Sequence, residues 1–216
     1  MNSNRKAKAK DAILMETALR RLKKSPDFIV DVGVRAGTPP LYNAFPESHF
    51  LLVDPQQGGE QELQSRPKHY DFFQLALGAL PGKMTLNAQG AHSSLLNRTP
   101  RTKKEGGVSR SVEIVRFEDL IEPLGSNATF GVKLDTEGFE LEIIKGFGSA
   151  VSRIEFLICE VSIRNRFVNG YIFSDLMSVL NKKGFRFYNF LNIPKPKPKR
   201  FYDCLFLQSG DPLFDK

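Results

Sequence analysis

The segment Lys133-Leu-Asp-Thr-Glu-Gly-Phe-Glu140 places a lysine and three carboxylates at the end of an apolar run. If this run is a strand, Lys133 and Asp135 share one side of it, because successive side chains alternate. The spacing of Glu137 and Glu140 predicts a shared face at the start of a helix, where their charge suits the helix dipole. Burying such groups is costly unless they are paired or hydrogen-bonded. The pattern predicts either a site for proton transfer and hydrogen bonding or a well-capped helix with a Lys–Asp pair.

A second candidate site begins at Asp31, where the apolar run Phe28–Val32 opens into a glycine-containing turn. Gly33 and Gly37 are expected to let the backbone turn tightly and to let a ligand approach it. Their spacing is G-x-x-x-G rather than G-x-G-x-x-G, which argues against a dinucleotide whose pyrophosphate faces a helix N-terminus. Asp31 is placed to accept hydrogen bonds from an ammonium or from backbone donors. The structural alternative is an ordinary turn.

Asp54 ends the next apolar run, His49–Val53. It follows the glycine turn by about 20 residues, the place from which a carboxylate accepts hydrogen bonds from ribose hydroxyls in α/β folds. A solvent-facing aspartate at a strand end is the alternative interpretation. The turn, the spacing and the acid together predict a ribose-bearing cofactor, either nicotinamide or adenosyl.

To bring these groups together, the chain needs parallel strands whose carboxyl ends meet at one edge. Apolar runs alternate with segments of helical periodicity, which predicts an α/β fold with a doubly wound, mostly parallel sheet. The last two strands have no obvious helix between them, so we expect them to pair antiparallel at one edge. The predicted strands cover residues 28–32, 49–53, 70–77, 83–86, 112–115, 130–134, 154–161, 185–191 and 202–207, and the predicted helices cover 11–24, 117–124, 137–145 and 172–183, with another beginning near 38–42.

Residues 88–107 are rich in Ser, Asn, Arg, Lys and Gly and lack a clear period, which predicts a long loop. The sequence leaves open whether this loop covers a site as a lid. The 216 residues suffice for one domain with a real core and are too few for two large ones. We therefore divide the chain into an N-terminal helical extension, residues 1–26, and one domain, residues 27–216.

Lysine and arginine total 31 against 24 acids, which gives a net charge of +7. This excess indicates either an anionic partner or a solvated basic face. Two cysteines are too few for a disulfide framework or a zinc site and indicate free thiols in a reducing compartment. The N-terminus lacks the apolar core of a secretory signal, and no apolar run approaches the ~20 residues that span a bilayer. We expect a cytoplasmic protein without integral membrane contact.

The sequence resembles the FkbM family of S-adenosylmethionine-dependent methyltransferases over most of its length, from about Phe28 to Leu207. The Lys-x-Asp-x-Glu-Gly-x-Glu string is the most specific feature. The first family motif usually runs Asp-x-Gly-Ala-Asn-x-Gly, whereas Val34 and Arg35 replace Ala-Asn here, which leaves open how the methionine end of the cofactor is held. Asp54 stands where the family often has Glu. The other matching segments are Val30-Asp-Val-Gly33, Gly37-Thr-Pro39, Leu52-Val-Asp-Pro55, Ala76-Leu-Gly78, Gly82, Ser93-Ser94, Ile158-Cys-Glu160 and Tyr202-Asp-Cys-Leu-Phe206.

The resemblance implies the class I methyltransferase fold, a three-layer α/β/α arrangement around a seven-stranded sheet with an antiparallel last strand. It also implies O-methyl transfer from S-adenosyl-L-methionine to a small, sugar-like acceptor. We expect Asp135 to lie closest to the methyl group and to act as the base or to hold the acceptor, with Glu137 in the same catalytic group and Lys133 balancing the charge. The expected cofactor-binding residues are Asp31, Gly33, Gly37, Asp54, Ala76, Leu77, Ser94 and Asp135, and the expected substrate-binding residues are Glu137, Glu140 and Glu160.

Two other functions stay open from the sequence. The basic stretches suggest a nucleic-acid methyltransferase, but no Asn/Asp-Pro-Pro-Tyr/Phe signature is present and no aromatic residues interleave with the basic runs as stacking platforms. A non-catalytic module that binds a glycan or a partner would keep the same fold. A nicotinamide oxidoreductase fits less well, because no Tyr-x-x-x-Lys pair appears. No metal is expected, although the acidic residues could offer oxygen ligands to Mg²⁺ or Ca²⁺, and the oligomeric state stays open.

Overall fold

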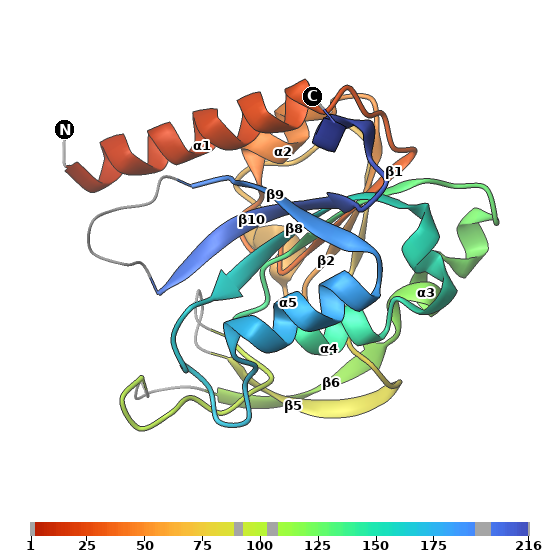
Figure 1. Ribbon diagram of the computed structural model, residues 1–216. Coiled ribbons are helices and arrows are strands. Elements are labelled where there is room, and N and C mark those ends of the chain that lie inside the picture. Colours follow the sequence, from red (N-terminus) through yellow and green to blue (C-terminus); the bar gives the residue numbers. More distant parts are fainter. Residues whose placement is uncertain (1–2, 89–92, 103–107, 193–199, 216) are drawn as a thin grey trace.

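A seven-stranded sheet with helices on both faces forms the centre of the molecule (Figure 1). The structure is a computed structural model that describes residues 3–88, 93–102, 108–192 and 200–215. The strand order is β3-β2-β1-β7-β8-β10-β9, and β10 runs antiparallel to both of its neighbours. The expected doubly wound α/β fold is confirmed. The strands of this sheet are β1 (Phe28–Val32), β2 (His49–Val53), β3 (Tyr70–Phe73), β7 (Phe130–Leu134), β8 (Ile154–Ser162), β9 (Phe185–Phe190) and β10 (Phe201–Gln208).

The central strands lie where the apolar runs predicted them. All five residues of β7 are buried, and so are four of the five in each of β1 and β2. A parallel strand covered on both faces must be apolar on both, so it appears in the sequence as a continuous run. Strand β1 has β2 on one side and β7 on the other. The chain therefore changes direction across the sheet between β1 and β7, where a crevice opens at the carboxyl ends of parallel strands.

Each face of the sheet has its own apolar core. On one face, Val30 and Val132 pack with Phe147, and on the other Ile29 packs with Leu19 and Tyr42. Figure 1 shows α1 and α2 on one side of the sheet and α4 and α5 on the other. The helices are α1 (Ser3–Arg21), α2 (Pro39–Ala44), α3 (Phe117–Ile121), α4 (Glu140–Lys145) and α5 (Phe173–Lys182), with short 3-10 turns η1 (Gly59–Glu62), η3 (Glu122–Leu124), η4 (Gly148–Arg153) and η5 (Pro212–Asp215).

The end of one predicted strand belongs to a second, three-stranded sheet. The single strand expected over residues 70–77 is wrong, because a turn in which the Leu75 amide donates to the Phe73 carbonyl at 3.0 Å separates β3 from β4. The short β4 (Ala76–Leu77) then pairs with β6 (Val108–Val115), which also pairs with β5 (Gly82–Ala88). This break moves Ala76 and Leu77 out of the main sheet.

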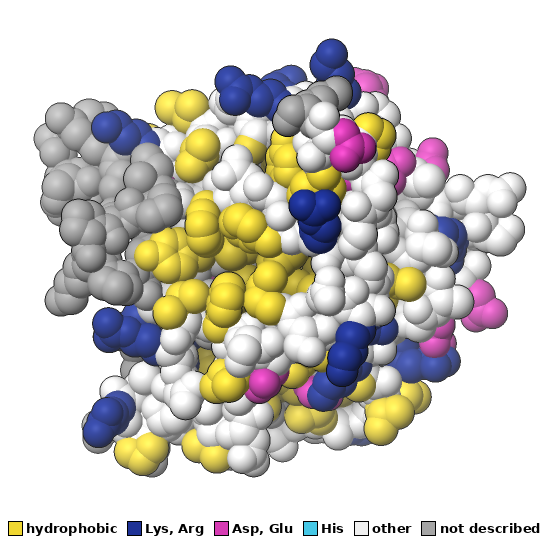
Figure 2. Space-filling view, viewed as in Figure 1, with side chains coloured by type: hydrophobic (Ala, Val, Ile, Leu, Met, Phe, Trp, Pro, Cys, Tyr) yellow, Lys and Arg dark blue, Asp and Glu magenta, His cyan; other side chains and the backbone are white. Residues whose placement is uncertain are grey.

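The N-terminal helix packs on the domain rather than standing apart from it. Helix α1 begins earlier than predicted, and its Met15 and Leu19 join the core beside α2, together with Leu22 just after the helix. Large apolar side chains remain exposed at Phe173 and Phe187, and Figure 2 shows apolar side chains gathered over the region of α5, β9 and β10. Within the described residues, no helix has both the length and the apolar composition needed to cross a bilayer.

Candidate active site

A cavity of about 590 Å³ opens at the carboxyl ends of β1, β2, β7 and β8. Residues Asp11, Ala12 and Met15 of α1 complete its wall. The cavity thus brings together side chains from segments far apart in the sequence. This is what we expected of parallel strands whose carboxyl ends meet at one edge of the sheet. Of the residues expected from the sequence, those that line it are Gly33, Gly37, Asp54, Ala76, Leu77, Ser94, Lys133, Asp135, Glu137 and Glu160. Asp31 and Glu140 do not line it.

Asp54 is held in place by the glycine turn. Its Oδ2 accepts a hydrogen bond from the Arg35 amide at 2.9 Å, and its Oδ1 accepts one from the Gln56 amide at the same distance. Burial raises the pKa of this carboxyl, and the two amide hydrogen bonds oppose that rise. Each carboxylate oxygen has more than one lone pair, so both can still accept a hydroxyl. Asp54 is therefore fixed as a two-oxygen acceptor at the cavity wall.

The glycines of the turn are required by the protein's own backbone. Gly33 has φ of +78° and Gly37 has φ of +101°, a region that L side chains rarely adopt. A Cβ on Gly33 would overlap the carbonyl oxygen of Asp135, and one on Gly37 would overlap that of Ser65. The turn is thereby pressed against the end of β7 without intervening side chains.

One end of the cavity is apolar. Ala76 and Leu77 are buried beside Phe139, with Leu86 and Ile143 also lining the wall. Such a slot suits a flat, largely apolar ring. Ser94 also lines the cavity, and its hydroxyl donates to the Glu137 carbonyl at 2.8 Å and so supports the acidic turn.

Lys133 lies at the junction of β1 and β7, directly opposite Asp31 in the register. Its ammonium donates to Asp31 Oδ1 at 3.1 Å and approaches Asp135 Oδ2 at 3.5 Å. Asp31 is completely buried, and its Oδ2 accepts a hydrogen bond from the Tyr42 hydroxyl at 3.1 Å. Asp31 therefore lies beneath the cavity, where it anchors Lys133, instead of facing a ligand.

The predicted helical face shared by Glu137 and Glu140 is wrong. Helix α4 begins at Glu140, and Glu137 precedes it with φ of +53° in a turn. Glu140 is completely buried, and its Oε1 accepts hydrogen bonds from the amides of Thr136 at 2.9 Å and Gly138 at 3.1 Å. Burial raises the pKa of Glu140, while these amides lower it. Its carboxylate shapes the turn that presents Glu137, and this explains why it does not line the cavity.

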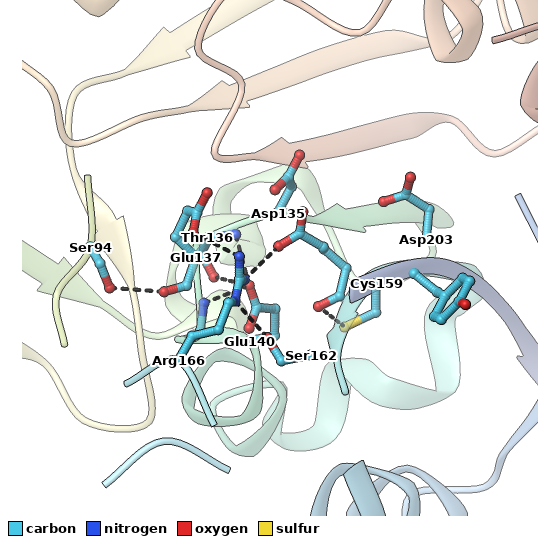
Figure 3. Close-up of polar contacts among 12 residues, drawn as sticks. Ser94, Asp135, Thr136, Glu137, Glu140, Cys159, Ser162, Arg166 and Asp203 are labelled. Carbon is cyan, nitrogen blue, oxygen red and sulfur yellow. Dashed lines mark hydrogen bonds and ion pairs between the residues drawn. The ribbon is translucent and has the colours of Figure 1, made fainter. Parts of the chain in front are cut away.

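Two arginines join the carboxylates on the far side of Asp135. Arg166 lies 3.1 Å from Glu137 Oε2, and both residues are labelled in Figure 3. Arg166 also donates to Glu160 Oε2 at 2.9 Å, and Arg98 donates to the same Glu137 oxygen at 3.1 Å. Arg166 is only 5% exposed. Burial, followed by the charge of Asp135, raises the pKa of Glu160 well above its ordinary value, and Arg166 opposes this rise. This end of the cavity is an ionic network.

Several members of the site escaped the sequence analysis. Asp203 lines the cavity, lies opposite Glu160 in the β10–β8 register, and accepts a hydrogen bond from Asn192 at 2.8 Å. A signal for it existed, since an acid interrupts the apolar run of β10. Arg98, Arg166 and Tyr42 gave no such signal. Across the described part of the chain, no group of three or more His, Cys, Asp or Glu side chains is arranged to hold a metal ion.

The sheet order, the antiparallel β10 and the cavity at the junction of β1 and β7 define the class I methyltransferase fold. The O-methyltransferase from Bacillus cereus in complex with S-adenosylhomocysteine shares this fold with a TM-score of 0.52 and 8% identity, over 93% of this chain and 81% of that one. Magnesium protoporphyrin IX methyltransferase from Synechocystis PCC 6803, with bound S-adenosylhomocysteine, gives a TM-score of 0.50 and 11% identity, over 97% and 88% of the two chains.

A comparison of the sequence with family models identifies the family. The model of the Methyltransferase FkbM domain matches residues 31–187, so the chain belongs to the FkbM methyltransferases, as the resemblance indicated. No curated protein matches it.

Proposed function

We propose that this methyltransferase transfers a methyl group from S-adenosyl-L-methionine to a hydroxyl oxygen of a sugar or another small hydroxylated molecule. The observation that carries the proposal is the set of carboxylates that line one end of the cavity beyond Asp54. Carboxylate oxygens accept hydrogen bonds from hydroxyls, and the residues of this set are Asp135, Glu137, Glu160 and Asp203.

The cavity residues fit the cofactor. Asp54 offers two oxygens to a ribose diol, and the slot at Ala76, Leu77 and Phe139 offers apolar surface to an adenine ring. When bound, S-adenosylmethionine supplies an electrophilic methyl group on a sulfonium sulfur. Gly33 and Gly37 line the same wall. We assign these residues, with Ser94 as a support of the neighbouring turn, to cofactor binding.

The chain's own residues would align the acceptor and take its proton. Holding the acceptor oxygen in line is a positioning effect. A hydroxyl becomes a good nucleophile only as its proton is removed, and a carboxylate within hydrogen-bond reach does this. We assign that role to Asp135, with the Lys133 ammonium 3.5 Å away balancing its charge. Glu137 and Glu160 would bind other acceptor hydroxyls, and Glu140 would act through the turn that it stabilises.

The network also bears on the nucleic-acid alternative. Arg98 begins the basic stretch Arg98–Lys104 of the sequence, which could have faced a phosphate backbone, but its guanidinium pairs with Glu137 inside the site. Carboxylates at the acceptor end would repel phosphates, since like charges in one cleft are unfavourable. This placement favours a neutral hydroxylated acceptor.

Two experiments test the proposal. Mass spectrometry of the purified protein should detect the bound cofactor or its demethylated product, and a transfer assay with labelled methyl groups should find an acceptor among sugars and small polyols. With that acceptor, Asp135→Asn should abolish transfer while calorimetry shows unchanged S-adenosylhomocysteine affinity. The matched control is Asp119→Asn, whose carboxylate pairs with Arg116 at the surface. Undiminished transfer by the Asp135 variant would remove it from the base role, and methylation of RNA or DNA alone would overturn the acceptor class.

A further inference from the structure

The cationic residues that line the cavity raise the question of what they bind. Among the described residues of the lining, these are Arg35 and Lys133. Arg35 is exposed, whereas Lys133 is 6% exposed and lies at the floor of the cavity. A cation kept at such a depth needs nearby negative charge, because burial alone disfavours the charged form.

Lys133 keeps its charge because it is paired. Burial lowers the pKa of its ammonium, but the charges of Asp31 and Asp135 raise it by more, so the net shift of the pKa is upward. An ammonium has three hydrogen-bond donors. Two point to Asp31 and Asp135, and within the described residues the third has no protein acceptor. That third donor is available at the floor of the cavity.

The position of Lys133 matches the part of the cofactor that is still without a partner. Asp54 and the apolar slot account for the ribose and the adenine, and they lie toward β2 and β4. Lys133 lies in the other direction, across the junction of β1 and β7. The amino-acid end of the cofactor carries an α-carboxylate, and the Lys133 ammonium is a fitting donor for this group. Charge-assisted hydrogen bonds of this kind are about twice as strong as neutral ones.

We propose that Lys133 binds the α-carboxylate of the methionine end of S-adenosylmethionine, and that Asp31 and Tyr42 are positioning residues that hold its ammonium there. The hydroxyl of Tyr42 fixes Asp31 Oδ2, and Asp31 Oδ1 fixes the lysine. This assignment rests on the proposed cofactor. The glycine turn here carries Val34-Arg35 where the family usually has Ala-Asn. Holding the Lys133 ammonium in place gives a role to Asp31 and Tyr42, which are buried beneath the cavity.

The test compares two ligands by calorimetry. S-adenosylhomocysteine has the amino-acid end, and methylthioadenosine has the same adenosine and thioether without it. Lys133→Met should weaken S-adenosylhomocysteine binding by about 10- to 100-fold, the value of a hydrogen bond to a charged group, and leave methylthioadenosine binding unchanged. Retained methylthioadenosine binding also shows that the variant is folded. Equal losses for both ligands, or no loss for either, would overturn the assignment.

Further variants keep the test decisive. Removing the lysine leaves Asp31 buried without its cation, so the variant could fail to fold. Tyr42→Phe keeps both ions and should still weaken S-adenosylhomocysteine binding selectively, by about threefold, since a neutral hydrogen bond contributes less. Tyr188→Phe, whose ring packs on Phe214 away from the cavity, is its control. If Arg35→Gln shows the selective loss and the Lys133 and Tyr42 variants do not, the proposal fails. If the wild-type protein binds neither ligand, the cofactor assignment fails instead.

Discussion

Gly33 and Asp135 touch through their backbones. The two residues directly follow strands β1 and β7 at the junction of the sheet, and a Cβ added to Gly33 would overlap the Asp135 carbonyl oxygen. The amide of Asp135 also donates to the Val32 carbonyl at 3.0 Å. The glycine turn and the acidic segment are therefore one rigid unit, and the place of the Asp135 carboxylate depends on the absence of a side chain at residue 33.

Gly33→Ala should disturb the site more than its backbone conformation alone predicts. A left-handed conformation costs an L residue about 1–2 kcal/mol. Gly58 has a similar φ of +73°, and a Cβ there meets its first neighbour at 3.6 Å, so Gly58→Ala measures this strain without overlap. We expect chemical denaturation to show a larger loss of stability for Gly33→Ala, together with lost S-adenosylhomocysteine binding. Equal losses for the two variants would show that the contact with Asp135 is unimportant.

Asp54→Asn should weaken S-adenosylhomocysteine and methylthioadenosine alike, because both ligands carry the ribose. The asparagine has one acceptor oxygen, and its amide group faces one of the two backbone amides that the carboxylate now accepts from, those of Arg35 and Gln56. We expect losses of about 10-fold or more by calorimetry. Asp71→Asn, which alters an exposed hydrogen bond with His49, should bind both ligands as the wild type does. A loss confined to S-adenosylhomocysteine would place Asp54 at the amino-acid end.

The positions of the central strands were predictable because a strand buried on both faces appears in the sequence as a continuous apolar run. Strands β1, β2 and β7 have the predicted bounds, and the pairing of β1 with β7 brings Asp31 opposite Lys133. The resemblance to one family and the class of fold also held. The break between β3 and β4 was not visible, because a turn inside an apolar stretch leaves the composition unchanged.

The roles of individual acids were less predictable. Glu137 and Glu140 are spaced as on a helix, but the same spacing serves a turn in which the second carboxylate accepts the backbone amides. Arg98 and Arg166 reach Glu137 from loops 39 and 29 residues away along the chain, which no local pattern reports. Their places depend on tertiary packing, and the sequence shows the charges without their partners.

Glu160→Gln should remove part of the pH dependence of stability. The pKa of Glu160 in the folded protein lies well above the ordinary value of 4.5. Between those two values the folded chain keeps a proton that the unfolded chain has lost, so stability falls as pH rises through this window. Glutamine is neutral at every pH and flattens that part of the slope. Glu140 and Asp54, whose pKa values are also raised, leave a smaller slope in both proteins.

Urea unfolding of the wild type and of Glu160→Gln between about pH 5 and about pH 8 measures this difference as a change in slope. Glu155→Gln, a change in the same strand at a residue outside the cavity lining, is a suitable comparison. Parallel slopes for the wild type and the Glu160 variant would show that this carboxyl ionises normally despite its burial.

Arg166→Gln should be among the more damaging substitutions near the site. It leaves Glu137 and Glu160 as neighbouring carboxylates without the cation that joins them, and removing one partner of a buried ion pair costs about 3–5 kcal/mol. The exposed Arg164→Gln should change little. Because the cost comes from unpaired charge, adding Glu160→Gln to the Arg166 variant should restore part of the lost stability, and a double-mutant cycle measures how much. If the double variant is as unstable as the two single losses added together, Arg166 supports the site through its packing over Phe167 and Phe201 instead of through charge.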